Sequence, residues 1–141
     1  MSAKSILVDT GPLVALLNKR DPHHSACAAT AAQLQLPMLT SWLVITEAAW
    51  LLRRSTAGAV PLLRLISDKV VACYELGSDA ADWMEQCMIR YSDVSPQLAD
   101  ASLLYLADRH KISTLFTLDR RDFLVYRSVT GSALNLLPTE L

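Results

Sequence analysis

The stretch "SILVDTGPLVALL", residues 5–17, contains a short apolar run that stops at Asp9, and hydrophobic residues resume after Gly11. Three consecutive aliphatic residues at 6–8 are typical of a buried parallel strand. Pro12 has the backbone angle that suits the first turn of a helix. Asp9 therefore lies where a strand gives way to a helix, and it is interpreted either as a helix cap or as part of a functional site.

The composition limits what kind of protein this is. A chain of 141 residues predicts a single domain over residues 1–141. No uninterrupted apolar stretch reaches about 18 residues, and the start lacks the features of a signal peptide, so we expect a cytoplasmic protein with no membrane contact. The three cysteines form no CxxC motif, which argues against a zinc site or a disulfide framework. A net charge of −1 means that any contact with nucleic acid must use a local basic patch.

Strand-like and helix-like segments alternate along the chain. After the first strand and a helix to about Lys19, strands are expected in "PMLTS", "VVACYEL", "ISTLFTLD" and "SALNLLP". Helices are expected to begin at Asp21, Ser41, Ser78 and Ser95, with further helices in "AVPLLRLISDK" and "RRDFLVY". This order predicts an α/β fold, a three-layer sandwich with a small, mostly parallel sheet flanked by helices.

Four acidic residues are expected to face one region. Asp9 and Asp119 each end an apolar strand, and ligands bind beyond the carboxyl ends of such strands. Glu47 and Asp100 fall within the apolar stripes of their helices, where a lone acid is costly. Taken singly, each acid is explained by a cap or a salt bridge. Together, they indicate a site for a hard cation, Mg²⁺ or Mn²⁺, because crowded carboxylates stay ionised only when a cation joins them.

These motifs resemble those of PIN-domain ribonucleases, specifically toxins of the VapC type. The resemblance rests on "ILVDTGPLVALL", the inward Glu47, "LADASLLYLA" around Asp100, and "TLDRRDFLVYR". It implies that Asp9, Glu47, Asp100 and Asp119 bind the metal and that Thr10 is the hydroxyl residue beside the first acid. It also implies Mg²⁺- or Mn²⁺-dependent endoribonuclease activity and inhibition by a cognate antitoxin, which would make the protein the toxin of a type II toxin–antitoxin pair.

The chain departs from the family pattern at Gln97, where related chains often have an acid. This departure puts a second tight metal position in doubt. Asp93 and Asp122 are candidates for an outer acid, although a solvent-exposed charge is the simpler interpretation of each.

Several basic residues are candidates for contacts with the substrate. Arg120 and Arg121 flank Asp119 and are possible RNA phosphate contacts, whereas Lys19, Arg20, Arg53 and Arg54 are interpreted as a solvated charged surface. The histidines, His23, His24 and His110, lie near expected helix ends and are not favoured as catalytic groups. Two other classes of protein with an acid after the first strand are not favoured. A phosphatase of the haloacid-dehalogenase type would need a second acid at the position of Gly11, and a receiver domain would need paired acids near the first strand, which the sequence lacks.

An enzyme that cuts RNA in the cytoplasm would have to be held inactive, and the resemblance to VapC-type toxins implies that an antitoxin does this. We also expect the chain to form a homodimer. Trp42, Trp50, Leu62 and Leu65 could supply the apolar contacts, or they could belong to the core. Two alternatives to the toxin stay open: a housekeeping PIN-type nuclease and a PIN-like binding module without catalytic activity.

Overall fold

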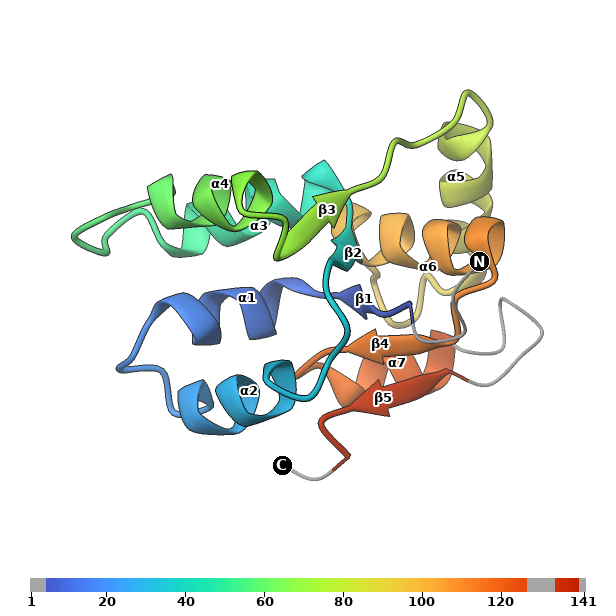
Figure 1. Cartoon of the computed structure of the whole chain (residues 1–141). Helices are drawn as coiled ribbons and strands as arrows, with labels where there is room; N and C mark the ends of the chain where they lie inside the picture. The colour runs from blue at the N-terminus through green and yellow to red at the C-terminus, as the bar shows by residue number, and fades with distance from the viewer. Residues whose placement is uncertain (1–4, 127–133, 140–141) are drawn as a thin grey trace.

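The computed structural model describes residues 5–126 and 134–139. A five-stranded sheet lies at its centre, in the order β3-β2-β1-β4-β5, and all its strand pairs are parallel (Figure 1). The strands are β1 (Leu7–Val8), β2 (Met38–Thr40), β3 (Val71–Cys73), β4 (Thr114–Phe116) and β5 (Asn135–Leu137). The chain order reverses at β1, whose neighbours are β2 and β4, and in parallel sheets such a reversal is the usual place for a ligand.

Helices make every connection between the described strands. They are α1 (Thr10–Leu17), α2 (His24–Ala31), α3 (Trp42–Leu51), α4 (Val60–Ser67), α5 (Ala80–Arg90), α6 (Leu98–His110) and α7 (Arg120–Tyr126). Two helix pairs, α1 with α2 and α3 with α4, extend to one side of the sheet as two arms (Figure 1). The expected α/β fold with a small parallel sheet is confirmed.

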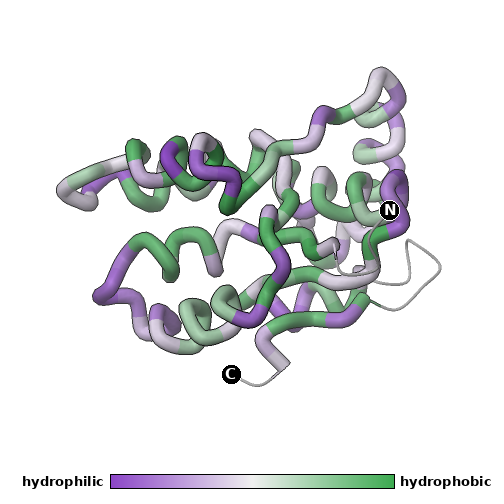
Figure 2. Tube along the Cα trace, viewed as in Figure 1, coloured by the Kyte–Doolittle hydropathy of each residue, from purple (hydrophilic) through white to green (hydrophobic). Residues whose placement is uncertain are grey.

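The core lies around β1 and α6. Both residues of β1 are buried, as is almost the whole of α6 from Ala99 to Ala107, because this helix packs against both α3 and α5. Figure 2 shows hydrophobic residues along the central strands and α1, while the turn at the tip of the α1–α2 arm is hydrophilic. Burial on several sides explains why these segments are apolar without strict alternation.

Several expected helix starts are wrong by two or three residues. The second helix begins at His24 and not at Asp21, because the Asp21 carboxylate accepts a hydrogen bond from the backbone N–H of His23 and so forms a local turn. Ser95 is not the cap of α6, since its backbone is left-handed, with φ 54°. Gln97 is the cap instead, because it forms a reciprocal capping box with Asp100.

Smaller differences affect other element ends. The first helix stops at Leu17, short of Lys19, and the fifth begins at Ala80 and not at Ser78. Part of the expected last strand, residues 132 and 133, lies outside the described residues, and the rest forms β5. Across the described ranges, none of the helices has the length and apolar character needed to cross a bilayer.

The expected apolar contact residues separate into two groups. Trp42 and Trp50 lie on α3 with 52% and 62% of their surface exposed, and Leu65 is half-buried. Leu62 is wrong as a contact residue, because it is 1% exposed and faces the core from α4. Because α4 packs against β3, α1 and α3, only its outer positions are free for partners.

Candidate active site

Asp9 joins β1 to α1 and makes contacts in both directions. Its carboxylate caps α1 by accepting a hydrogen bond from the backbone N–H of Thr10 at 2.7 Å, so the cap interpretation holds. The side chain is also buried beside other acids. Burial is the main reason that its pKa rises to about 6; the negative charges of Glu47 and Asp119 add to the rise, and the hydrogen bonds from Thr10 and Thr117 oppose it. A cap alone does not produce this crowding of carboxylates.

Thr117 links the ends of the two central strands, and sequence reasoning missed it. Its hydroxyl donates to Asp9 Oδ2 at 2.8 Å and accepts from the backbone N–H of Asp119 at 2.9 Å. The residue is fully buried. A threonine two positions before an acid at a strand end is the signal that could have revealed it, because its hydroxyl can both accept locally and reach the neighbouring strand.

Glu47 reaches the same region from the second turn of α3. Its Oε1 accepts a hydrogen bond of 2.9 Å from the Thr10 hydroxyl. The start of α3 is fixed by Ser41, whose side chain caps the helix and lies 2.7 Å from the hydroxyl of Ser102 on α6. This buried hydroxyl pair ties together the two helices that carry Glu47 and Asp100.

Asp100 lies in the first turn of α6. One of its carboxylate oxygens accepts a hydrogen bond of 3.2 Å from the backbone N–H of Gln97. Burial is the main reason that its pKa rises to about 7, and the charges of Asp9, Asp119 and Glu47 add to the effect. Gln97, where related chains often have an acid, therefore takes part in holding Asp100.

The fourth acid, Asp119, is paired with Asp122 at the start of α7. Burial and then the charge of Asp122 raise the pKa of Asp119. The two residues are three apart on a helical turn, a spacing that puts side chains on the same face. Asp93 is exposed and does not lie among these acids.

These side chains line one cleft of about 470 Å³, here called the acidic cleft. It is lined by Asp9, Thr10, Gly11, Glu47, Leu51, Ser95, Gln97, Asp100, Leu118, Asp119 and Asp122. None of these described residues is basic, so nothing in the lining balances the carboxylates.

The donor set of the acidic cleft suits a hard divalent cation, because it consists of carboxylate and hydroxyl oxygens. Among the described residues, no three His, Cys, Asp or Glu side chains are already arranged as a metal-binding group. A cation there would be held by one or two carboxylates at a time, with water completing its shell. That is the usual arrangement for Mg²⁺.

Comparison with known proteins identifies the family of this chain. The family model for the PIN domain matches residues 6–127. The chain belongs to the PIN-domain family.

One curated relative of this PIN domain is the ribonuclease VapC26 of Mycobacterium tuberculosis. It is 27% identical over 136 residues, which is 94% of this chain and 100% of the relative. The resemblance to PIN-domain ribonucleases of the VapC type, expected from the motifs, is thereby confirmed.

Two solved structures share the PIN fold of this chain. The sarcin–ricin loop cleaving toxin VapC20 of Mycobacterium tuberculosis matches with a TM-score of 0.77 and 21% identity, covering 89% of this chain and 95% of that one. FitAcB from Neisseria gonorrhoeae matches with a TM-score of 0.60 and 15% identity, covering 92% and 96% of the two chains. At these identities, the likeness concerns the fold alone.

The other candidate residues of this PIN domain are not among those that line the acidic cleft. Arg120 and Arg121 are not among the residues that line it, and the Arg120 guanidinium donates a hydrogen bond to the backbone carbonyl of Pro138. His24 Nδ1 lies 2.7 Å from the Ala15 carbonyl oxygen, and His110 packs edge-on against Tyr74. No histidine lines the cleft in the part of the chain described here.

Proposed function

We propose that this PIN domain is a metal-dependent endoribonuclease that uses the acidic cleft as its active site. The observation that carries the proposal is the convergence of Asp9, Glu47, Asp100 and Asp119 from four separate elements on one cleft without a basic residue. A binding module with no catalytic role has no need of this arrangement, because desolvated carboxylates repel both each other and RNA.

The four acids are the proposed ligands of Mg²⁺ or Mn²⁺, and the Thr10 hydroxyl holds Glu47 through a hydrogen bond. When bound, such a cation lowers the pKa of a coordinated water and stabilises negative charge on a phosphodiester. Asp9 and Asp119 extend from adjacent strands, so the sheet fixes their spacing. The Thr10 hydroxyl donates to Glu47 Oε1 and so helps to fix the position of that carboxylate, and the Thr117 hydroxyl helps to fix Asp9 by donating to Oδ2.

Proton movement in the proposed reaction falls to water. Asp100, whose pKa is about 7 without metal, would have to release its proton to bind the cation, so a water rather than Asp100 would take up and return protons beside the phosphodiester. The described lining of the cleft offers neither histidine nor lysine for this task. Asp122 lies beside Asp119 and raises the pKa of that carboxyl through its negative charge, although it is not one of the four proposed ligands.

The test is cleavage of total RNA by the purified chain, with Mg²⁺, with Mn²⁺ and with excess chelator, followed by mapping of the cut sites. We expect cuts only when metal is present, and their loss in Asp9→Asn and Asp119→Asn. The matched control is Asp68→Asn, which removes an exposed carboxylate at the end of α4, outside the acidic cleft. Full activity in chelator, or in both cleft variants, would contradict the proposal.

The toxin role, a cytoplasmic location, the antitoxin and the homodimer belong to the same proposal. They are supported by the VapC relative and by exposed Trp42 and Trp50 on α3, which offer apolar surface to a protein partner. Expression of the chain alone should arrest growth, and co-expression of the neighbouring reading frame should relieve the arrest. Harmless expression of a chain that cuts RNA and runs as a monomer in gel filtration would favour a housekeeping nuclease.

A further inference from the structure

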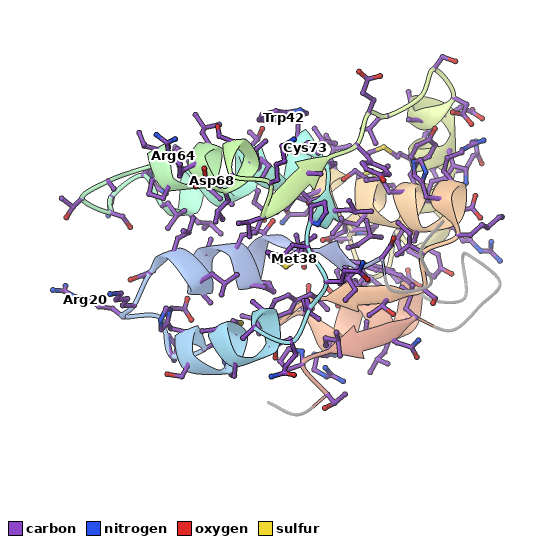
Figure 3. All side chains as sticks on the ribbon, in the orientation of Figure 1. Arg20, Met38, Trp42, Arg64, Asp68 and Cys73 are labelled. Atoms are coloured by element: carbon purple, nitrogen blue, oxygen red, sulfur yellow. The ribbon has the colours of Figure 1, made fainter. Side chains whose placement is uncertain are left out.

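A second groove, of about 640 Å³, lies between the tips of the two arms. One wall comes from the end of α1 and the turn after it, with Asn18, Lys19 and Arg20. The other comes from the end of α3 and the segment that leads to α4, with Leu51, Arg54 and Ser55. Arg20 extends from the tip of its arm (Figure 3). The residues named here define the basic groove.

The charges of the basic groove are the reverse of those in the acidic cleft. Its described lining contains three cations, Lys19, Arg20 and Arg54, and no acid. All three side chains are exposed. Within the described residues, the one ion pair joins Arg109 to Asp79, so none of these cations has a carboxylate partner. They are therefore available to an anion from outside the chain.

The two sites adjoin at Leu51. This residue lines both the acidic cleft and the basic groove, and it lies one helical turn, about 6 Å, beyond Glu47 on α3. A ligand that leaves the acidic cleft along α3 enters the basic groove directly. Because half of the Leu51 surface is exposed, at 52%, its side chain is open to contact with that ligand.

We propose that the basic groove binds the phosphates of single-stranded RNA next to the bond that is cut, an inference that rests on the proposed nuclease function. Because the acidic cleft and the basic groove adjoin, one ligand is expected to occupy both. Its reacting phosphate would lie at a metal ion held by the carboxylates, and its neighbouring phosphates would contact Lys19, Arg20 and Arg54. A polyanionic strand does so. The chain carries a net charge of −1, so it depends on such a local patch to attract RNA at all.

Hydrogen-bond donors and a nearby ring complete the groove. Asn18 and Ser55 supply polar side chains in its walls. One residue before Leu51 on α3, 62% of the Trp50 surface is exposed, and the guanidinium of Arg53 lies 3.7 Å from the centre of its ring. Arg53 covers one face of the indole, so an unpaired base could stack only on the other face.

Lys19 and Arg54 follow the carboxyl ends of α1 and α3, outside the last turn of each helix, so their charges can have only a small favourable effect on the helix dipoles. That role affects stability and not RNA binding. The experiment therefore measures the two separately, with melting temperature recorded for every variant.

The experiment is a fluorescence-anisotropy titration of the full chain in excess chelator, with a labelled single-stranded oligouridylate of about 12 nucleotides, at several salt concentrations. The test variant carries Lys19→Gln, Arg20→Gln and Arg54→Gln. The control variant loses the same charge from exposed residues outside the groove, through Arg64→Gln, Lys69→Gln and Arg90→Gln. Arg64 points away from the α1–α2 arm (Figure 3).

Each phosphate contact on a single strand contributes about 0.7 to the slope of log affinity against log salt. The test variant should lose about 2 units of slope, so a fourfold rise in salt weakens wild-type binding roughly twentyfold more than it weakens binding to the variant. Arg54→Gln alone should lose about 0.7 and Arg54→Lys should lose nothing. The control variant should keep the wild-type slope.

An unchanged slope in the test variant, or an equal loss in the control, would overturn the proposal. The proposal would also be overturned if the test variant kept the wild-type salt dependence of RNA binding but no longer bound a co-expressed protein partner. The groove would then be a site for that partner. Binding in chelator does not require cleavage. If no RNA is cut with any metal, the nuclease function fails, while the salt slope still decides the role of the groove.

Discussion

Replacing Asp9 with asparagine should stabilise the metal-free protein at pH 8 and lose that advantage at pH 4. In the folded state the pKa of Asp9 is about 6, against 3.8 in an ordinary environment. The folded protein therefore binds more protons than the unfolded chain between these values, and its stability falls as the pH rises through them. Below pH 4 the carboxyl is protonated in both states, and the cost of its charge disappears.

The magnitude follows from the same shift. About two pKa units, at about 1.4 kcal/mol each, make ionised Asp9 cost roughly 3 kcal/mol above pH 6. Asparagine keeps an oxygen for the backbone N–H of Thr10 but turns an amide toward the Thr117 hydroxyl, at a cost of about 1 kcal/mol. We expect a net gain of about 2 kcal/mol at pH 8 and a loss of about 1 kcal/mol at pH 4.

Urea unfolding in excess chelator, at pH 8 and at pH 4, measures both values. Asp68→Asn is the control, because Asp68 is an exposed acid at the end of α4. Stabilisation of equal size at the two pH values would refute the reasoning, since it could not arise from the charge of Asp9. Destabilisation at both would show that the hydrogen bonds of the carboxylate outweigh its desolvation.

Three further outcomes are expected. Mg²⁺ at a hundred times its dissociation constant should raise the stability of the wild type by about 2.7 kcal/mol and that of Glu47→Gln by less, as measured by thermal unfolding. Thr117→Val should lower stability by about 1 to 3 kcal/mol and reduce RNA cleavage, because two buried hydrogen bonds are lost, whereas Thr117→Ser should retain both properties. Tyr126→Phe should stabilise the fold by up to about 1 kcal/mol in urea unfolding, since the buried Tyr126 hydroxyl has no hydrogen-bond partner among the described residues. A loss of stability would contradict this expectation and would show that the hydroxyl does make a hydrogen bond.

The sequence was informative where local chemistry decides the structure. The apolar run before Asp9 and the one before Asp119 each predicted a parallel strand that ends on an acid, and both strands are present; β1 ends directly before Asp9, whereas β4 ends at Phe116, three residues before Asp119. The helical spacing of Glu47 and Asp100 placed them on inward faces because a helix has a fixed period. These patterns needed no knowledge of distant contacts.

Other features depend on contacts that a linear pattern does not contain. Thr117 gains its role only because β4 lies beside β1, which brings its hydroxyl to Asp9 across 108 positions of sequence. The basic groove likewise combines residues from two arms that are separate in sequence, so Lys19 and Arg54 looked like ordinary surface charges. Ser95 misled because serine and proline suit a helix start, yet the capping box formed two residues later, at Gln97.

The cap formed by Asp9 limits which inactive forms of this protein can be made. Position 9 begins α1 as well as belonging to the acidic cleft, so a replacement must supply a side-chain oxygen to the backbone N–H of Thr10. Asparagine, serine and threonine can do this, whereas alanine forfeits about 1 kcal/mol of helix stability. Inactive protein for trapping intact RNA should therefore be sought among those three substitutions, and a failed alanine variant says as much about the start of a helix as about catalysis.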